Sequence, residues 1–179
     1  MRSRAGHRFA LLRTFWIVAL ITLSGVARSE TPFTFTVPQS RVLVKISAPS
    51  LLPDATASAK PNYFKLTRRE PLLIVSGWLE PAQQYKGLDA FWQSESRSPA
   101  YAGSLAPVRV EMLREGAWEV VAFDVSVPGA TQSNLRAERV EAGMWIDLHL
   151  STIAPSATPS ATLRADLLAV LRQVQVQQK

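Results

Sequence analysis

The chain of 179 residues contains no cysteine. This absence excludes a disulfide framework, a zinc ribbon, an iron–sulfur site, a thiol nucleophile and a lipid-modified N-terminal cysteine. Only two histidines are present, and His7 lies in the N-terminal segment, so a metal site built from several histidines is excluded as well. The sequence also lacks a glycine-rich phosphate loop, a nucleophile elbow, a zinc-protease motif and an EF-hand loop. No metal ion and no cofactor are therefore expected.

The net positive charge is small outside the N-terminus. The whole chain has 20 Lys and Arg, 14 Asp and Glu, and a net charge of +6. Residues 1–29 contain five of the arginines and no acidic residue, so residues 30–179 carry a net charge of only +1. A nucleic-acid-binding domain needs a basic patch of its own, and the basic doublet Arg68-Arg69 is followed directly by Glu70. We therefore expect no nucleic-acid partner.

The first 29 residues have the features of a signal peptide. Four arginines precede an apolar run over residues 14–23, and mostly small residues follow at 24–29. Cleavage is predicted after Ala27 or after Ser29, which makes the mature protein periplasmic or secreted. The alternative is an uncleaved anchor, although an apolar run of about ten to fourteen residues is shorter than the roughly 20 that span a bilayer. Contact with a membrane is thus expected only through this segment.

Residues 30–179 are predicted to form a single α+β domain. Helical periodicity indicates helices over about 88–97 and about 159–173, with Thr158 as the N-terminal cap of the second. Alternating or apolar segments indicate strands at 33–37, 41–47, 62–67, 71–79, 108–113, 118–127, 133–141 and 144–152, with 174–177 as a candidate last strand. Hairpin connections dominate, and no repeat or long linker divides the chain. The expected architecture is an antiparallel β-sheet with packed helices.

The sequence also predicts which of several apolar residues are buried and which are exposed. The nearly continuous apolar segment at 71–79 is typical of a strand covered on both faces. Trp78 and Trp92 lie on apolar patterns that predict core positions, whereas Trp118 is expected to be half exposed. Covering by a helix is expected for Trp145. A hairpin around Glu115-Gly116 is expected to place one apolar set on one face: Val108, Val110, Met112, Val121, Phe123 and Val125.

The order of these elements resembles a known fold. An N-terminal strand pair, an apolar strand and a helix containing Phe91-Trp92 come first. Two hairpins follow, the second with Trp145–Leu150, and a closing helix then runs into a short strand over Leu163–Gln177. This layout is similar to the PsbP-like α/β/α sandwich of small secreted or lumenal proteins and of several exported bacterial proteins. The resemblance implies an accessory role, as an assembly factor or a binding protein, and it brings no catalytic motif.

A two-residue turn at 142–143 brings the candidate ligand-binding residues to one face of a hairpin: Arg136, Glu138, Trp145, Asp147 and His149. In this register Arg136 lies opposite His149, and Glu138 lies opposite Asp147. Like charges in such positions destabilise a strand pair unless Arg136 neutralises them, water screens them, or they share a proton or a cation. The alternative interpretation is a solvent-facing ladder of salt bridges that binds no ligand.

Two functions are compatible with these features. The first is an exported, non-enzymatic accessory protein that binds a protein partner or a small-molecule ligand in the cell envelope. The second is a periplasmic hydrolase-type enzyme that uses His149 with Asp147 and a serine. The hydrolase is disfavoured because Asp147, His149 and Ser151 follow one another on one strand at steps of about 7 Å, which is too far for direct hydrogen bonds.

Overall fold

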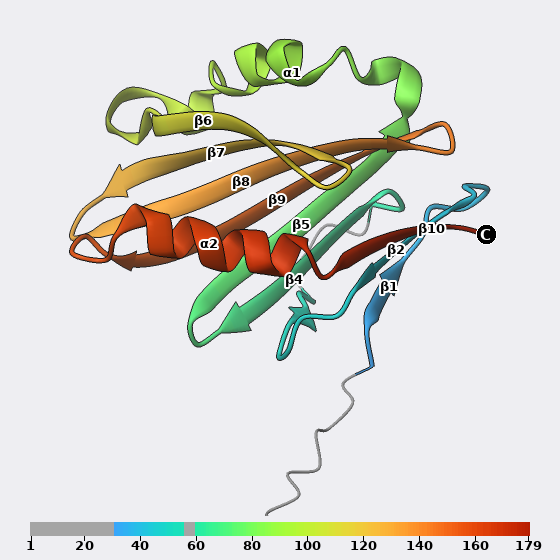
Figure 1. Cartoon of the computed structure of the whole chain (residues 1–179), viewed down its shortest axis with the longest axis horizontal. Helices are drawn as coiled ribbons and strands as arrows, with labels where there is room; N and C mark the ends of the chain where they lie inside the picture. Colours follow the sequence, from blue (N-terminus) through green and yellow to red (C-terminus); the bar gives the residue numbers. More distant parts are fainter. Residues whose placement is uncertain (1–30, 56–59) are drawn as a thin grey trace, which may run out of the picture.

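The computed structural model describes residues 31–55 and 60–179, and the predicted signal peptide lies outside these residues. The largest element is a seven-stranded antiparallel sheet with the strand order β3-β4-β5-β9-β8-β7-β6 (Figure 1). Its strands are β3 (Leu52–Pro53), β4 (Tyr63–Arg69), β5 (Leu72–Pro81), β6 (Val108–Glu115), β7 (Trp118–Val127), β8 (Ala130–Glu141) and β9 (Met144–Pro155). A second, three-stranded sheet contains β1 (Phe33–Phe35), β2 (Val42–Ile46) and β10 (Val174–Gln178).

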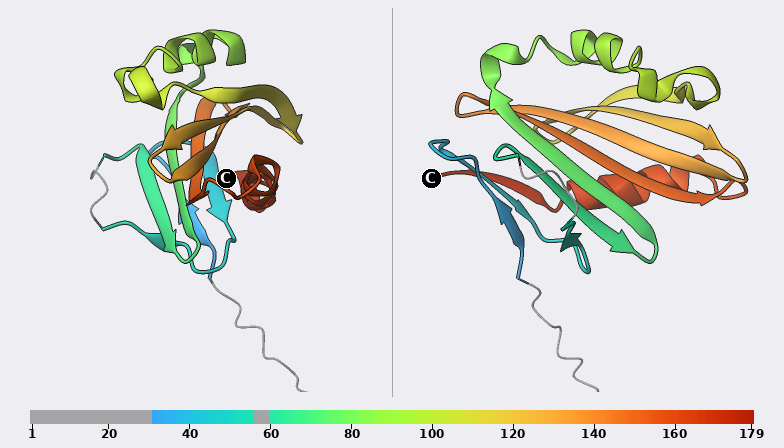
Figure 2. Two further views of the ribbon diagram at one scale, coloured as in Figure 1. Left: turned by 90° about the vertical axis from the view of Figure 1, so that its left-hand side faces the viewer. Right: turned by 180° about the vertical axis from the view of Figure 1, so that it is seen from behind.

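Two α-helices cover opposite faces of the large sheet (Figure 2). Helix α1 (Leu88–Glu95) lies over one face, and helix α2 (Ser160–Leu171) lies against the other. Three short 3₁₀ helices flank α1 in the chain: η1 (Ala82–Gln84), η2 (Pro99–Tyr101) and η3 (Gly103–Leu105). The layers are thus helix, sheet and helix, and the predicted α+β class is confirmed. Within the described residues, no helix has the length and apolarity that crossing a membrane requires.

The main hydrophobic core lies on the α2 face of the sheet. Apolar residues of α2 recur at helical spacing and are buried, as predicted: Leu163, Leu167, Val170 and Leu171. Leu167, Val170 and Leu171 belong to one cluster with buried residues of the small sheet and of the strands, including Val42, Val44, Leu66, Val75, Leu135, Leu148 and Leu150. Burial of this apolar surface, at about 25 cal/mol per Å², is the principal stabilisation of the domain.

The start of α2 differs from the prediction. Pro159, and not Thr158, occupies the N-terminal cap position, and no side chain caps the helix. The Pro159 carbonyl accepts the backbone N–H groups of Thr162 and Leu163 at 3.0 and 3.4 Å. The extended ψ of Pro159, 130°, ends the preceding segment, so the helix begins one residue later than the sequence pattern predicted.

A smaller core lies between α1 and β7 on the opposite face. The ring of Trp92 packs against Phe123 with 4.9 Å between ring centroids, and Tyr101 contacts Phe123 edge-on at 5.4 Å. Val121 and Val125 complete the cluster. The predicted core position of Trp92 is therefore correct. Because α1 is anchored on β7, it does not bury the outer face of β5 (Figure 2).

Strand β5 is buried on one face only, so the prediction of cover on both faces is wrong. Its residues alternate between buried and half-buried, and Trp78 is on the half-buried face instead of in the core. The error has a simple cause. The sequence is nearly continuously apolar here, although only the residues between Ile74, Ser76 and Trp78 contact the main core. Trp118, which was expected to be half exposed, is buried in the main core.

The two hairpins follow their predicted registers to different extents. In β8–β9 the turn residues Ala142 and Gly143 both have positive φ, 46° and 80°, as a tight hairpin turn requires. In β6–β7 the turn residues are Gly116 and Ala117, one residue later than predicted. Met112 pairs with Val121 and so shares its face, as expected, but an irregularity between Val108 and Glu111 shifts the rest of the register. Val108, Val110 and Met112 are exposed and not part of a covered apolar face.

The register shift in β6 coincides with a buried charge on β7. Asp124 is fully buried on the α2 face, and the Arg109 Nε donates to its Oδ2 at 2.7 Å. Burial by itself would raise the pKa of Asp124, but hydrogen bonds from Arg109 and from the hydroxyls of Ser133 and Ser160 hold it below its usual value. Arg109 lies within the irregular segment and has a φ of 52°. The bulge thus supplies the cation that Asp124 needs.

Candidate functional site

Strands β8 and β9 bring the predicted site residues together on the α1 face of the sheet. Arg136 is paired with His149, and Glu138 with Asp147, as the sequence predicted. The next pair on this face towards the turn is Val140 with Trp145, which places Trp145 beside them. The five side chains therefore share one surface, and the turn at 142–143 determines which residues face each other.

Glu138 and Asp147 form a buried carboxyl pair. Glu138 is 0% exposed and Asp147 is 7% exposed. Burial, and then repulsion from Asp147, raise the pKa of Glu138 to about 10, although Arg136 and the Trp145 N–H act in the opposite direction. Glu138 is thus protonated at neutral pH. The interpretation of this pair as a solvent-facing ladder is wrong, because both side chains are buried.

A shared proton satisfies this pair. Two buried oxygens of the pair, Glu138 Oε1 and Asp147 Oδ1, have no hydrogen-bond donor other than a proton on one of the two carboxyls. With its proton, the Glu138 carboxyl donates to Asp147, and this hydrogen bond favours the protonated form of Glu138. The pair then carries a single negative charge, next to Arg136, which donates to Asp147 Oδ2. Of the three arrangements that the sequence left open, the structure supports proton sharing combined with a nearby arginine.

Arg136 connects the carboxyl pair to α1. Its Nη2 donates to Asp147 Oδ2 at 2.6 Å, and its Nη1 lies 3.6 Å from Glu95 Oε1. The guanidinium carbon is 5.0 Å from the centroid of the Phe91 ring. Only 12% of the Arg136 side chain is exposed, so the charge of Arg136 is held between two carboxylates and an aromatic ring.

Trp145 has a fixed orientation. Its indole N–H donates to Glu138 Oε2 at 2.5 Å. One side of the ring stacks on Tyr85 at 5.4 Å between centroids, and Phe91 contacts it edge-on at 6.1 Å. Tyr85 in turn donates to Glu119 Oε2 at 2.7 Å. The segment from η1 to α1 thus covers part of Trp145, as expected, while the rest of the ring remains accessible.

His149 is half-buried and does not line a pocket with the other site residues. Its Nε2 lies 3.0 Å from Asn134 Oδ1, so Nε2 carries the ring hydrogen and donates it. Burial, and then the nearby Arg136 charge, lower the pKa of His149 to about 3. The ring is thus neutral, and its Nε2 is hydrogen-bonded to an amide and not to a serine hydroxyl. This geometry gives no support to a hydrolase based on His149.

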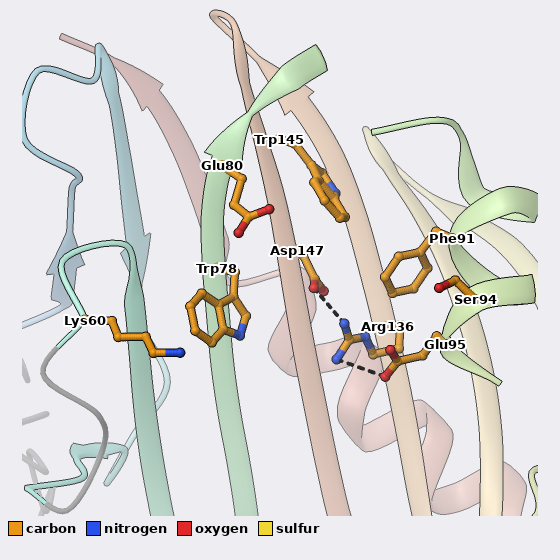
Figure 3. Close-up of a pocket in the computed structure, with 9 residues that line it drawn as sticks. All are labelled: Lys60, Trp78, Glu80, Phe91, Ser94, Glu95, Arg136, Trp145 and Asp147. Carbon is orange, nitrogen blue, oxygen red and sulfur yellow. Dashed lines mark hydrogen bonds and ion pairs between the residues drawn. The ribbon is translucent and has the colours of Figure 1, made fainter. Parts of the chain in front are cut away.

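The accessible side of this cluster is a pocket with a volume of about 470 Å³, which we call the aromatic pocket (Figure 3). It is lined by Lys60, Trp78, Glu80, Phe91, Ser94, Glu95, Arg136, Trp145 and Asp147. Strands β5, β8 and β9 form its floor, α1 forms one wall, and Lys60 lies on the opposite side (Figure 3). Three of the five predicted residues line it directly, whereas Glu138 and His149 do not.

Comparison with known proteins supports the fold. No family model and no curated protein sequence matches the chain. Among solved structures, a point mutant of the protein Mog1 superposes with a TM-score of 0.50 at 9% identity, over 82% of this chain and 96% of Mog1. Mog1 shares this fold. The shared antiparallel sheet is consistent with the PsbP-like layout and confirms the fold class, while the low identity transfers no residue role.

Two further solved structures are similar at lower scores. LpqN of Mycobacterium tuberculosis, described as involved in cell envelope biogenesis, has a TM-score of 0.47 at 15% identity, over 82% of this chain and 90% of LpqN. A protein from Bacteroides thetaiotaomicron VPI-5482 has a TM-score of 0.46 at 9% identity. That match covers 82% of this chain, which spans about half of the Bacteroides protein, 48% of its length.

Sequence reasoning missed the contributions of β5 and α1 to the pocket. Trp78 is paired with Asp147, and Glu80 with Trp145. Alternation along β5 places Trp78 and Glu80 on one face, but the pairing of β5 with β9 joins segments far apart in the chain, and no local pattern indicates it. In α1, the spacing of Phe91, Ser94 and Glu95 marks a single helical face. Metal-binding side chains do not gather in groups of three or more within residues 31–55 and 60–179.

Proposed function

We propose that the protein is an exported, non-enzymatic binding protein that takes a small organic ligand into the aromatic pocket. The observation that carries this proposal is the pairing of two tryptophans, Trp78 and Trp145, with the buried Arg136–Asp147 ion pair in one preformed pocket. The volume of about 470 Å³ falls in the range of small-molecule sites. The similarity to a PsbP-like layout supports an accessory role but not a particular ligand.

The pocket residues favour binding over chemistry. Indole faces provide stacking surfaces for a flat or compact ligand, and the charged groups of Arg136, Asp147 and Glu95 are fixed by one another. A preorganised site loses little side-chain entropy when a ligand binds. In contrast, the imidazole of His149 is neutral, hydrogen-bonded and outside the pocket lining.

Retention of a ligand tests this proposal. Native mass spectrometry of the mature protein isolated from the cell envelope is expected to detect a non-covalent small-molecule adduct. Trp78→Ala is expected to lose this adduct while the melting temperature changes little, because Trp78 is half-buried and outside the main core. Ile153→Ala is the matched control, since Ile153 is also partly exposed and lies on β9 away from the pocket. Equal adducts in both variants would contradict binding at Trp78.

Export has a separate test. The intact mass of the protein from the periplasm or the culture medium is expected to match a chain that begins at Arg28 or at Glu30, which correspond to cleavage after Ala27 or after Ser29. A full-length species that retains Met1 in the membrane fraction would contradict cleavage. That result would leave the binding proposal in place and change only how the domain is held in the envelope.

A further inference from the structure

The floor of the aromatic pocket has an alternating arrangement of aromatic and acidic residues. The registers of β5 and β9 place Trp78 opposite Asp147 and Glu80 opposite Trp145. Facing residues in a sheet have Cβ atoms about 5 Å apart, and diagonal neighbours about 7–8 Å. Two indoles and two carboxylates thus occupy alternate corners of one small area (Figure 3).

One of these carboxylates is not neutralised by an arginine. Arg136 is engaged by Asp147 and by Glu95, which leaves little of its charge for a ligand. Glu80 is half-buried, lines the same pocket and forms no ion pair among the described residues. The lining contains three carboxylates against two cations, so the pocket favours positive charge.

An ammonium group already occupies part of this pocket. The Nζ of Lys60 lies 4.7 Å from the centroid of the Trp78 ring, which is the geometry of a cation–π contact. Lys60 is exposed, and Figure 3 shows its side chain reaching towards Trp78 from the edge of the pocket. Tyr63 contacts the same indole at 4.5 Å between centroids and helps to fix it. The structure therefore indicates what kind of group this indole attracts.

We infer that the ligand is a free organic cation, a primary or quaternary ammonium compound, whose charged group binds between Trp78, Trp145 and Glu80 in place of the Lys60 ammonium. This inference rests on the proposed binding function and specifies its ligand class. Aromatic faces together with a carboxylate are the usual surroundings of a bound quaternary ammonium group. Burial of the cation against two indoles also avoids the loss of any ion pair that the protein already makes.

Isothermal titration calorimetry of the mature protein with choline and with 3,3-dimethylbutan-1-ol tests this inference. The alcohol has the shape of choline but carries no charge. Choline is expected to bind at least tenfold more tightly than the alcohol. Benzyltrimethylammonium, which adds a ring for stacking, is expected to bind more tightly than choline, and glucose and propionate serve as the neutral and anionic probes.

Two charge variants are expected to change the affinity for choline in opposite directions. Glu80→Gln is expected to weaken choline binding at least fivefold, because it removes the unpaired carboxylate. Lys60→Gln is expected to strengthen choline binding a few-fold, because it removes the competing ammonium group. Glu70→Gln is the control for a general loss of negative charge, since Glu70 is exposed and outside the pocket, and it is expected to have no effect.

The outcomes separate the inference from the proposed function. Binding of the alcohol, glucose or propionate as tightly as choline, or no saturable binding of either ammonium compound, overturns the cation inference. A small-molecule adduct that depends on Trp78 would then still support a binding protein. Weaker choline binding in Lys60→Gln also overturns the inference, because it would show that Lys60 helps to bind the ligand. With neither an adduct nor binding of any probe, both the inference and the proposed function fail.

Discussion

A Leu167→Asp variant is expected to lose the folded state. Leu167 is 1% exposed at the centre of α2, where it belongs to the main core between the helix and the large sheet. A carboxylate in this position has no partner and costs several kcal/mol to bury, which is comparable with the total stability of a domain of this size. Circular dichroism during heating, and size-exclusion chromatography, are expected to show a missing cooperative transition and aggregation.

Ala169→Asp provides the matched control for this substitution. Ala169 lies on the exposed face of the same helix, so the new carboxylate remains in water. Its free energy of unfolding is expected to fall by only about 1 kcal/mol, because Asp has a lower helix propensity than Ala and an unfavourable charge in the last turn. If Leu167→Asp melted cooperatively at the wild-type temperature, α2 would not be docked on the sheet.

The second large expected effect is on the pH dependence of the free energy of unfolding. In the unfolded chain Glu138 ionises near its ordinary pKa of 4.5, whereas in the folded protein burial and Asp147 raise its pKa to about 10. Between these values the folded state binds one proton more than the unfolded state. The contribution of Glu138 is therefore fully present below about pH 4.5 and is lost as the pH rises towards 10.

Glu138→Gln is expected to remove this dependence and to stabilise the domain by a few kcal/mol at pH 8. The glutamine amide can donate to Asp147 and accept the Trp145 N–H, as the protonated acid does, but it is neutral at every pH. Urea denaturation at pH 5, 7 and 9 measures the difference. Between pH 7 and pH 9 the wild-type stability is expected to decline and the variant stability to decline much less. Below about pH 6.5 the lowered pKa of His149 acts in the opposite direction and offsets the Glu138 dependence.

Glu141→Gln is the control on the same strand. The pKa of Glu141 is lowered by hydrogen bonds from Gln178 and Arg139, so its contribution to stability is present above pH 4.5 and is lost in acid. This substitution is expected to leave the alkaline decline unchanged. Parallel stability curves for the wild type and Glu138→Gln would show that the carboxyl pair does not share a proton.

The β8–β9 hairpin could be predicted because its information is local. The Ala142-Gly143 turn fixes the register, and the alternation of apolar and polar residues leaves one arrangement that keeps Ile146 and Leu148 in the core. The pairing of Arg136, Glu138, Asp147 and His149 follows from these facts. A helix stripe such as that of α2 is predictable for the same reason, since its period lies within a few turns.

The pocket itself could not be predicted from local patterns. Its floor depends on the pairing of β5 with β9, and its wall depends on which side of α1 faces the sheet. The sequence pattern grouped Phe91 with Trp92, but the structure separates them: Trp92 packs on β7, and Phe91 turns towards Arg136. In β6, the departure from the expected register coincides with a buried charge on the neighbouring strand, Asp124, which residue alternation does not reveal.

The placement of α1 has a consequence for engineering the aromatic pocket. The pocket wall is a single eight-residue helix, anchored through Trp92, whose adjacent side carries Phe91, Ser94 and Glu95. None of these three side chains belongs to the main core on the α2 face. Because these positions lie outside the main core, a library confined to them is a compact starting point for engineering new specificities. Each variant has to replace the contacts that Phe91 and Glu95 make with Arg136.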